Sequence, residues 1–248
     1  MSSLQLDAVT RPQPGRRSRN GDATTTMAST LTARLRNDII RGRLAPGSKL
    51  KIKDLAEAYG VGTIPLREAL SRLTTSGFLD FEDQKGFRVR PVSQAELQDL
   101  TRVRLLVEKE ALRDAIAHAD LDWEERIVGA LHRMSRLPIV QPERGATLNT
   151  DWESAHDDFH RQLLSNCSSA WLKGFADTLR DQTTRYRHLT VGASAGPQRN
   201  VPGEHKAIVD AILARDADAA CRVLEQHLQR TTELALTHSN TEPGFVAS

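Results

Sequence analysis

The stretch from Gly60 to Pro91, "GVGTIPLREALSRLTTSGFLDFEDQKGFRVRP", carries the pattern that decides the fold. Pro65 suits the first turn of a helix over 65–77, because its missing N–H costs nothing there, and Gly77 can close that helix. "FLDFE" and "FRVRP" then flank the loop "DQKG" and alternate apolar with polar residues, which is typical of a β-hairpin. The stretch therefore predicts a helix followed by a two-stranded wing.

Two further short helices are expected before this stretch. Apolar residues recur at helical spacing in 31–42, and a second helix fits 52–60. Ala56 and Gly60 supply a small residue and a tight turn at the spacing that a helix-turn-helix needs, with Leu66 as the apolar contact of the next helix. That spacing alone also fits an ordinary helical hairpin. Three helices and a hairpin together predict a winged helix-turn-helix.

Beyond Pro91 the pattern becomes helical throughout, with no strand candidate. A first long helix is expected over 93–119, and five more near 122–136, 149–166, 169–189, 202–214 and 217–238, with loops at 137–148 and 191–201. The fold class is therefore mainly α, an N-terminal winged helix-turn-helix followed by an all-α six-helix bundle. We expect a disordered tail over 1–26, the winged domain over 27–92, the helical domain over 93–240 and a flexible C-terminus over 241–248.

The composition excludes several classes of protein. Of the 248 residues, 39% are hydrophobic and only 4% aromatic, and no uncharged apolar run approaches the ~18–20 residues that span a bilayer. The N-terminus has no apolar segment of the kind found in signal peptides. The two cysteines, Cys167 and Cys221, make a disulfide framework improbable. These features predict a cytoplasmic protein that does not enter the membrane.

The net charge of +2 conceals an asymmetry between the two halves. Residues 1–92 hold 16 Lys and Arg against 9 Asp and Glu, whereas residues 93–248 hold 18 against 23. A basic module joined to a mildly acidic one suggests two different partners, and a polyanion is the natural partner of the basic one.

Four of the eight histidines have an informative spacing. His156 and His160 are four residues apart and share a helix face, while His205 and His227 lie at similar distances on either side of an expected helical turn near 215–217. An antiparallel hairpin would place the latter two at the same height, ~15 Å from the turn. Three helices could thus bring four imidazoles together, a set that suits zinc, nickel, copper or iron. Scattered core or surface histidines remain the other interpretation of these residues.

The region 31–91 resembles the DNA-binding domain of the GntR family of bacterial transcription regulators. The matching pieces are "GRLAPGSKL" at 42–50, "DLAEAYGV" at 54–61, "PLREAL" and "RL" within 65–73, "GFL" at 77–79 and "KGFRV" at 85–89. The resemblance implies that the third helix enters the major groove of double-stranded DNA and that the wing tip enters the minor groove. The DNA-contacting residues expected from it and from their charge are Lys49, Lys51, Lys53, Thr63, Arg67, Arg72, Lys85 and Gly86.

The chain departs from the family pattern at the start of the recognition helix. Gly62, Thr63 and Ile64 stand where the family usually has Ser-Arg-Thr. Because the missing arginine is usually a base contact, we expect an operator that differs from the family's common one. Arg67 remains in place and could bind a guanine with two hydrogen bonds.

The second half resembles the FCD effector-binding domain, through "RLLVE" at 104–108, "FHRQLL" at 159–164, "EHKAIVDAI" at 204–212 and "QHL" at 226–228. Many such domains hold a metal with an Asp and three His. Here His160, His205 and His227 match the histidines, and His156 stands at the Asp position. The resemblance implies a divalent transition metal, zinc or nickel, whose identity the substitution leaves open. Six helices after the wing are more similar to the VanR-type branch than to the FadR-type branch.

An effector site is expected beside the metal. Arg104 matches the family's R-x-x-x-E pattern and could bind an effector carboxylate, although it could equally pair with Glu108 four residues later; Arg187 is a second candidate. A neutral four-His set with a divalent cation would leave a net positive cavity that favours an anion.

These observations predict a regulator rather than an enzyme. We expect a homodimeric repressor that binds a palindromic operator and whose affinity for it is modulated by a small organic acid. One alternative is a metal-free regulator that responds to an acyl-CoA or another bulky ligand. The other is a helical metalloenzyme fused to a nucleic-acid module, against which stands the lack of any H-E-x-x-H, G-x-S-x-G or P-loop motif.

Overall fold

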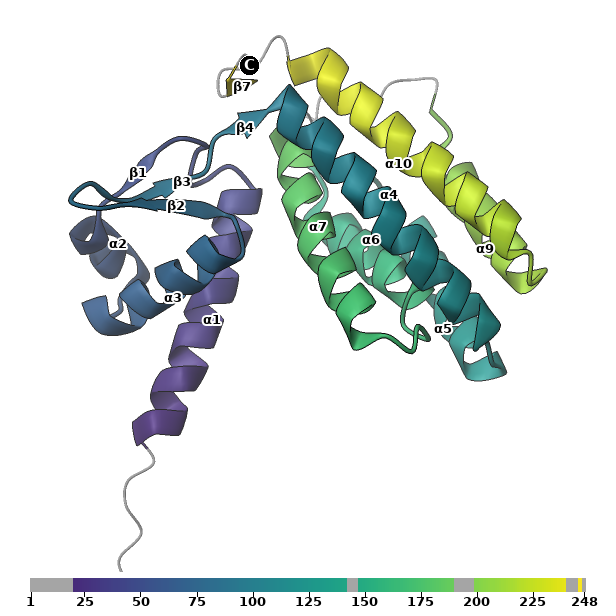
Figure 1. Cartoon of the computed structure of the whole chain (residues 1–248), viewed down its shortest axis with the longest axis horizontal. Coiled ribbons are helices and arrows are strands. Elements are labelled where there is room, and N and C mark those ends of the chain that lie inside the picture. The colour runs from purple at the N-terminus through teal and green to yellow at the C-terminus, as the bar shows by residue number, and fades with distance from the viewer. Residues whose placement is uncertain (1–19, 142–146, 190–198, 240–244, 247–248) are drawn as a thin grey trace, which may run out of the picture.

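A computed structural model describes residues 20–141, 147–189, 199–239 and 245–246 of the chain. Figure 1 shows a small unit of helices and strands beside a bundle of longer helices, with the connection between them at β4 (Val92–Ser93). The mainly helical class expected from the sequence is confirmed.

The N-terminal unit is a winged helix-turn-helix. Its sheet is antiparallel with the order β1-β3-β2, and Phe81 in β2 pairs with Phe87 in β3. The elements are α1 (Asn20–Ile40), β1 (Lys49–Leu50), α2 (Ile52–Tyr59), α3 (Thr63–Thr75), β2 (Leu79–Glu82) and β3 (Gly86–Val89). The third strand, β1, lies between the two short helices expected at 31–42 and 52–60, where the sequence pattern predicted no strand.

Leucines spaced along α1 and α3 form the core of this unit. Leu35, Leu66 and Leu70 are fully buried and pack with Phe78, which follows the predicted helix stop. Gly60 ends α2 with φ 65°, a left-handed conformation that a residue with a side chain adopts at a cost. The helix-turn-helix spacing therefore forms as predicted.

The second unit is a bundle whose helices are started by side-chain caps. Ser93 accepts a hydrogen bond from the N–H of Glu96 at 3.1 Å, and Asp120 accepts one from Trp123 at 2.8 Å. The described helices are α4 (Gln94–Ala117), α5 (Leu121–Ser135), α6 (Thr150–Leu163), α7 (Ala170–Leu189), α9 (Val201–Leu213) and α10 (Ala217–Ser239). Each lies within a few residues of its predicted range.

Three details differ from the expectations. Helix α1 begins at Asn20, within the expected tail 1–26 and about three turns before the expected start at 31, because extending an existing helix is far cheaper than starting one. Residues 1–19 lie outside the described part. Strands β5 (Val140–Gln141) and β6 (Thr147–Leu148) pair within the expected loop 137–148. Strand β7 (Phe245–Val246) pairs with β4, in the segment expected to be flexible. Two-residue strands are too short to show any sequence period.

Helix α7 contacts both units. Gln182 donates to the carbonyl of Ser76 at 2.7 Å, and Arg185 donates to the carbonyl of Arg90 at 2.6 Å. Asp181, on the same helix, pairs with Arg36 of α1 at 2.8 Å. One helix of the bundle thus contacts the winged unit at three points.

Within the described ranges, no helix combines the length and the apolar character that a membrane crossing requires.

Candidate functional site

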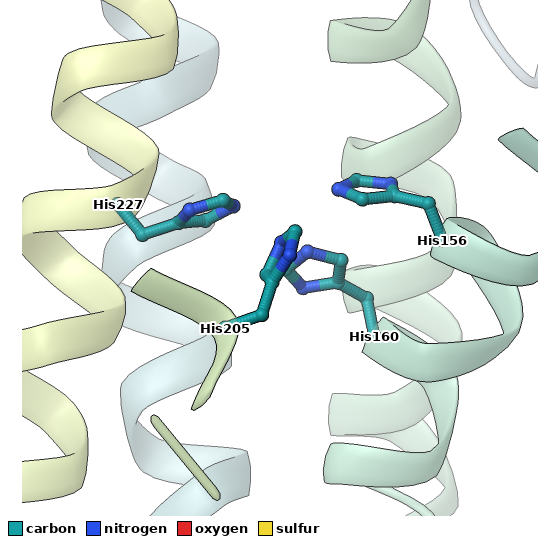
Figure 2. A group of neighbouring side chains, drawn as sticks. All are labelled: His156, His160, His205 and His227. Atoms are coloured by element: carbon teal, nitrogen blue, oxygen red, sulfur yellow. The ribbon is translucent and has the colours of Figure 1, made fainter. Parts of the chain in front are cut away.

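Helix α6 and the hairpin of α9 and α10 bring four histidines together inside the bundle. Figure 2 shows His156 and His160 projecting from one helix toward His205 and His227. One ring nitrogen from each lies within 4.8 Å of one from every other, and all four side chains are buried. The helical spacing of the first pair and the hairpin symmetry of the second place them as predicted.

The ring separations confirm that the hairpin sets two histidines at one height. The ring centroids of His205 and His227 are 4.6 Å apart, and those of His156 and His160 are 4.5 Å apart. Phe159 packs edge-on against His160 at 5.3 Å and His205 at 5.1 Å, so an apolar wall fixes the rings from one side.

The polar atoms of this cluster fit a metal ion. Among the described residues, both ring nitrogens of His160 and Nε2 of His205 are buried without a hydrogen-bond partner. Burying such groups unpaired costs about 1–3 kcal/mol each. Imidazole nitrogens bind zinc at about 2.0–2.1 Å, so two nitrogens on one zinc ion are at most about 4.2 Å apart. The ring nitrogens of this cluster lie within 4.8 Å of one another, so small side-chain movements would bring them to that separation.

A carboxylate supports one of the four rings. Nδ1 of His227 lies 2.8 Å from Oε2 of Glu204, which also pairs with Arg199 at 2.7 Å. A carboxylate only accepts, so Nδ1 of His227 carries the hydrogen and Nε2 keeps its lone pair. Such carboxylate–histidine pairs orient and strengthen metal ligands.

His156 stands where the FCD pattern usually has an aspartate, and it has cationic and aromatic neighbours. Arg187 donates to its Nδ1 at 3.2 Å, and Trp152 stacks on its ring with centroids 4.7 Å apart. Arg187 also lies 3.6 Å from Glu153 and 3.5 Å from Asp157. Asp157 thus pairs with Arg187 and is not among the four clustered ligands.

Burial sets the protonation of the cluster. It lowers the pKa of His156, His160 and His205 well below the usual histidine range, which makes the rings neutral near pH 7. It also lowers the pKa of His227, although the hydrogen bond to Glu204 opposes this. Burial alone would raise the pKa of Glu204, but hydrogen bonds from His227 and Arg199 bring it below its usual range. Neutral imidazole is the form that binds metals.

A cavity of about 40 Å³ adjoins the cluster. Its cationic wall is formed by Arg104, Arg187 and Arg199, and its apolar wall by Ile139, Leu148, Trp152, Val201 and Leu228. Arg104 pairs with Glu108 at 2.7 Å, as considered from the sequence, and also donates to Thr183 at 2.9 Å. Both predicted effector residues therefore line the same cavity as three of the four histidines.

Sequence reasoning missed three residues of this site. Trp152 precedes His156 by one helical turn, a spacing that could have found it. Glu204 is adjacent to His205, yet adjacency does not indicate that it contacts His227. Arg199 comes from a segment without periodicity and is placed only by the packing of α9 against α10.

The predicted DNA-contacting residues lie in the winged unit. Thr63 and Arg67 are exposed on α3, and the wing tip carries Lys85 beside Gly86, whose φ is 84°. Figure 1 shows the N-terminal end of α3 and the wing tip on the side of this unit remote from the bundle. Lys49, Lys51 and Lys53 are exposed at β1 and the start of α2.

Three of these cations have acidic neighbours, and the first, Lys51, lies 3.9 Å from Asp54. Arg72 pairs with Glu68 at 2.6 Å and donates to Ser29 at 2.9 Å. Lys85 pairs with Glu82 at 2.7 Å, which lowers the pKa of Glu82 through a hydrogen bond. Arg72 is thus tied to its own domain, whereas Arg67 projects from the exposed face of α3.

Two family models match the chain. Residues 27–89 match the gntR family of bacterial regulatory proteins, and residues 99–230 match the FCD domain. The first match covers the winged unit, and the second covers the bundle that holds the four histidines.

Similar proteins cover most of the chain. BphR of Paraburkholderia xenovorans, described as an uncharacterized HTH-type transcriptional regulator, is 42% identical over 79% of this chain and 80% of its own length. The transcriptional repressor GlaR of Escherichia coli is 32% identical over 78% of this chain and 89% of its own. The structure of E. coli McbR/YncC has the same fold, with a TM-score of 0.73 at 20% identity, covering 86% and 99% of the two chains.

Proposed function

Because the chain belongs to the GntR family of DNA-binding transcription regulators and carries an FCD domain, we propose that it is a repressor controlled by a small organic acid. The acid would bind beside a divalent metal, zinc or nickel, held by His156, His160, His205 and His227. The regulator would act as a homodimer on a palindromic operator, with two recognition helices one DNA turn apart.

The observation that carries the proposal is a cluster of four buried imidazoles, three of which line one cavity together with three guanidinium groups. Arg104, Arg187 and Arg199 each have an acidic partner, so the apo site is near electrical balance. A divalent cation bound by neutral histidines would add two positive charges. A carboxylate is the ligand that would offset them.

The size of the cavity supports a small effector over an acyl-CoA. A water molecule needs about 10–15 Å³ of such space, so about 40 Å³ accommodates only a few heavy atoms. The orphaned nitrogens of His160 likewise favour a metal-dependent site over a metal-free pocket. The relatives are transcription regulators and not enzymes, which argues against the alternative that the chain is a metalloenzyme fused to a nucleic-acid module.

For the acid to change the affinity for the operator, it must bind more tightly to one arrangement of the winged unit and the bundle than to another. Helix α7 offers a route, because Arg187 lines the cavity while Gln182 and Arg185 contact the winged unit. Moving a two-state equilibrium from 1:99 to 99:1 needs about 10⁴-fold differential affinity.

The test begins with an operator obtained by selection from random duplexes. Operator affinity of the zinc-loaded protein is then measured by fluorescence anisotropy, with and without each of a panel of small carboxylic acids. We expect at least one acid to lower operator affinity in the wild type and to have no effect in Arg187→Ala. If acids bind in calorimetry yet none changes operator affinity, the switching function is wrong.

A further inference from the structure

A second cavity, of about 30 Å³, adjoins the histidine cavity between α4, α7 and α10. Arg104, Arg187, Leu228 and Thr231 line both cavities, so the two guanidinium groups stand where they meet. What distinguishes the second cavity is its set of hydroxyl groups. We call the group the threonine chamber, and its members are Thr101, Thr183, Thr184, Thr231 and Thr232.

The hydroxyl hydrogens of the threonine chamber are already used. Thr183 and Thr184 both donate to the carbonyl of Arg180, at 3.0 and 2.8 Å. Thr231 donates to the carbonyl of His227 at 2.9 Å. Thr101 donates to the carbonyl of Leu97 at 2.8 Å, so in its 2.8 Å contact with Thr232 the latter must be the donor.

Each hydroxyl has one hydrogen and two lone pairs, so these bonds leave the chamber with acceptors to offer. Arg104 and Arg199 use one lone pair each on Thr183 and Thr231, both at 2.9 Å. A ligand group that donates hydrogen bonds can therefore enter without breaking any of these bonds. A carboxylate would face oxygen lone pairs there and leave them unpaired, which costs binding energy.

Of the two common donor groups, the electrostatics favour a hydroxyl over an ammonium. Arg104 and Arg187 border the chamber, and a metal at the histidines would add further positive charge. An ammonium would be repelled by these cations, whereas a neutral hydroxyl is not. The carboxylate of the same ligand would be attracted to the guanidinium groups where the cavities meet.

We propose that the threonine chamber is a subsite for the distal hydroxyl group of a short hydroxycarboxylic acid whose carboxylate lies at Arg104, Arg187 and the histidine cluster. This inference rests on the proposed function and specifies the class of effector. The combined space suits a chain of about four carbons, since each cavity holds only a few heavy atoms.

The test uses four acids of equal chain length that differ only in the distal group: butyrate, 4-hydroxybutyrate, 4-aminobutyrate and succinate. Binding to the zinc-loaded full-length protein is measured by titration calorimetry. We expect 4-hydroxybutyrate to bind about tenfold more tightly than butyrate, the effect of one to two buried hydrogen bonds, and more tightly than the two charged analogues.

Two nearly isosteric variants locate the effect. Thr232→Val and Thr184→Val should each reduce the preference for 4-hydroxybutyrate over butyrate by about threefold or more, because each removes a hydroxyl that accepts from the ligand. Thr237→Val is the matched control, because Thr237 lies on α10 and is exposed outside both cavities. Two variants on different helices guard against a folding defect in one of them.

The inference is overturned if butyrate, succinate or 4-aminobutyrate binds as tightly as 4-hydroxybutyrate, if the variants weaken all acids equally, or if none of the four binds. The proposed function is judged separately, by metal content and by the response of operator affinity to the wider panel of acids. Loss of the hydroxyl preference alone therefore leaves the proposed function standing.

Discussion

At the scale of single residues, we propose that the contact between Glu204 and His227 prepares one histidine of the cluster to bind a metal. The 2.8 Å hydrogen bond keeps the hydrogen on Nδ1 and leaves Nε2 free, so this imidazole needs no proton rearrangement to become a ligand. His156 differs, because its Nδ1 accepts from Arg187 and the neutral ring must carry its hydrogen on Nε2. Metal binding through Nε2 of His156 would require Arg187 to turn toward Glu153 or Asp157, which already lie close to it.

Glu204→Gln should weaken zinc binding by about 10–100-fold, because the amide supports the imidazole less strongly than the carboxylate does. Competition with a chromophoric chelator measures the affinity. Glu225→Gln serves as control, since Glu225 pairs with Lys109 near the surface. Equal affinities in wild type and Glu204→Gln would contradict a supporting role for this carboxylate.

Arg67→Ala should reduce affinity for the selected operator by about 1–3 kcal/mol and relax the base preference at one position of each half-site, because a bidentate contact to guanine is lost. Arg222→Ala, an exposed arginine on α10, is the control and should have no effect. A uniform loss across all duplex sequences would instead identify Arg67 as a phosphate contact.

At the scale of elements, α7 is the part that the two units share. Its residues at 181, 182 and 185 contact the winged unit, and Arg187 contacts the histidine cluster. These positions lie within two turns of one another, and a helix is stiff over that length. A displacement at Arg187 is therefore carried to the residues that contact the winged unit.

Removing two of these links should separate the unfolding of the two units. In Gln182→Ala combined with Arg185→Met, each lost hydrogen bond weakens the interface by about 1 kcal/mol. We expect the wild type to unfold in a single calorimetric transition and the transition of the double variant to broaden or split. Thr178→Ala, exposed on the same helix, should unfold like the wild type. An unchanged, single transition in the double variant would show that these contacts do not join the units.

The sequence predicted the long elements well and the short ones poorly. Helices such as α4 and α10 repeat their apolar positions over several turns, whereas β5, β6 and β7 have two residues each and arise from tertiary pairing. The histidine cluster could be predicted because helical spacing and hairpin symmetry are local rules. Arg199 and the threonine chamber could not, because they depend on how α4, α7 and α10 pack together.

At the scale of the whole molecule, the charge asymmetry separates two kinds of binding. The basic first part is suited to a polyanion, while the histidine cavity and the effector site proposed there lie in the mildly acidic bundle. Exposed charges are screened by salt, whereas buried pairs are screened much less. The two activities should therefore respond differently to ionic strength.

Operator affinity should fall steeply with salt, on the order of 10³-fold between about 50 and 200 mM, because bound phosphates release counterions. Zinc affinity should change far less over the same range, since the four histidines are buried. Anisotropy and chelator competition in the same buffers measure both. Equal salt dependence of the two would contradict this separation of charge.

The most direct test of the metal centre is metal content by mass spectrometry, on protein purified without chelators. The wild type is compared with the double variant His160→Ala, His205→Ala, which removes one ligand from each pair in Figure 2. We predict about one divalent metal per chain in the wild type and its loss in the double variant, with folding checked by circular dichroism. No metal in the wild type, or an equal content in both proteins, would contradict a metal centre at these histidines.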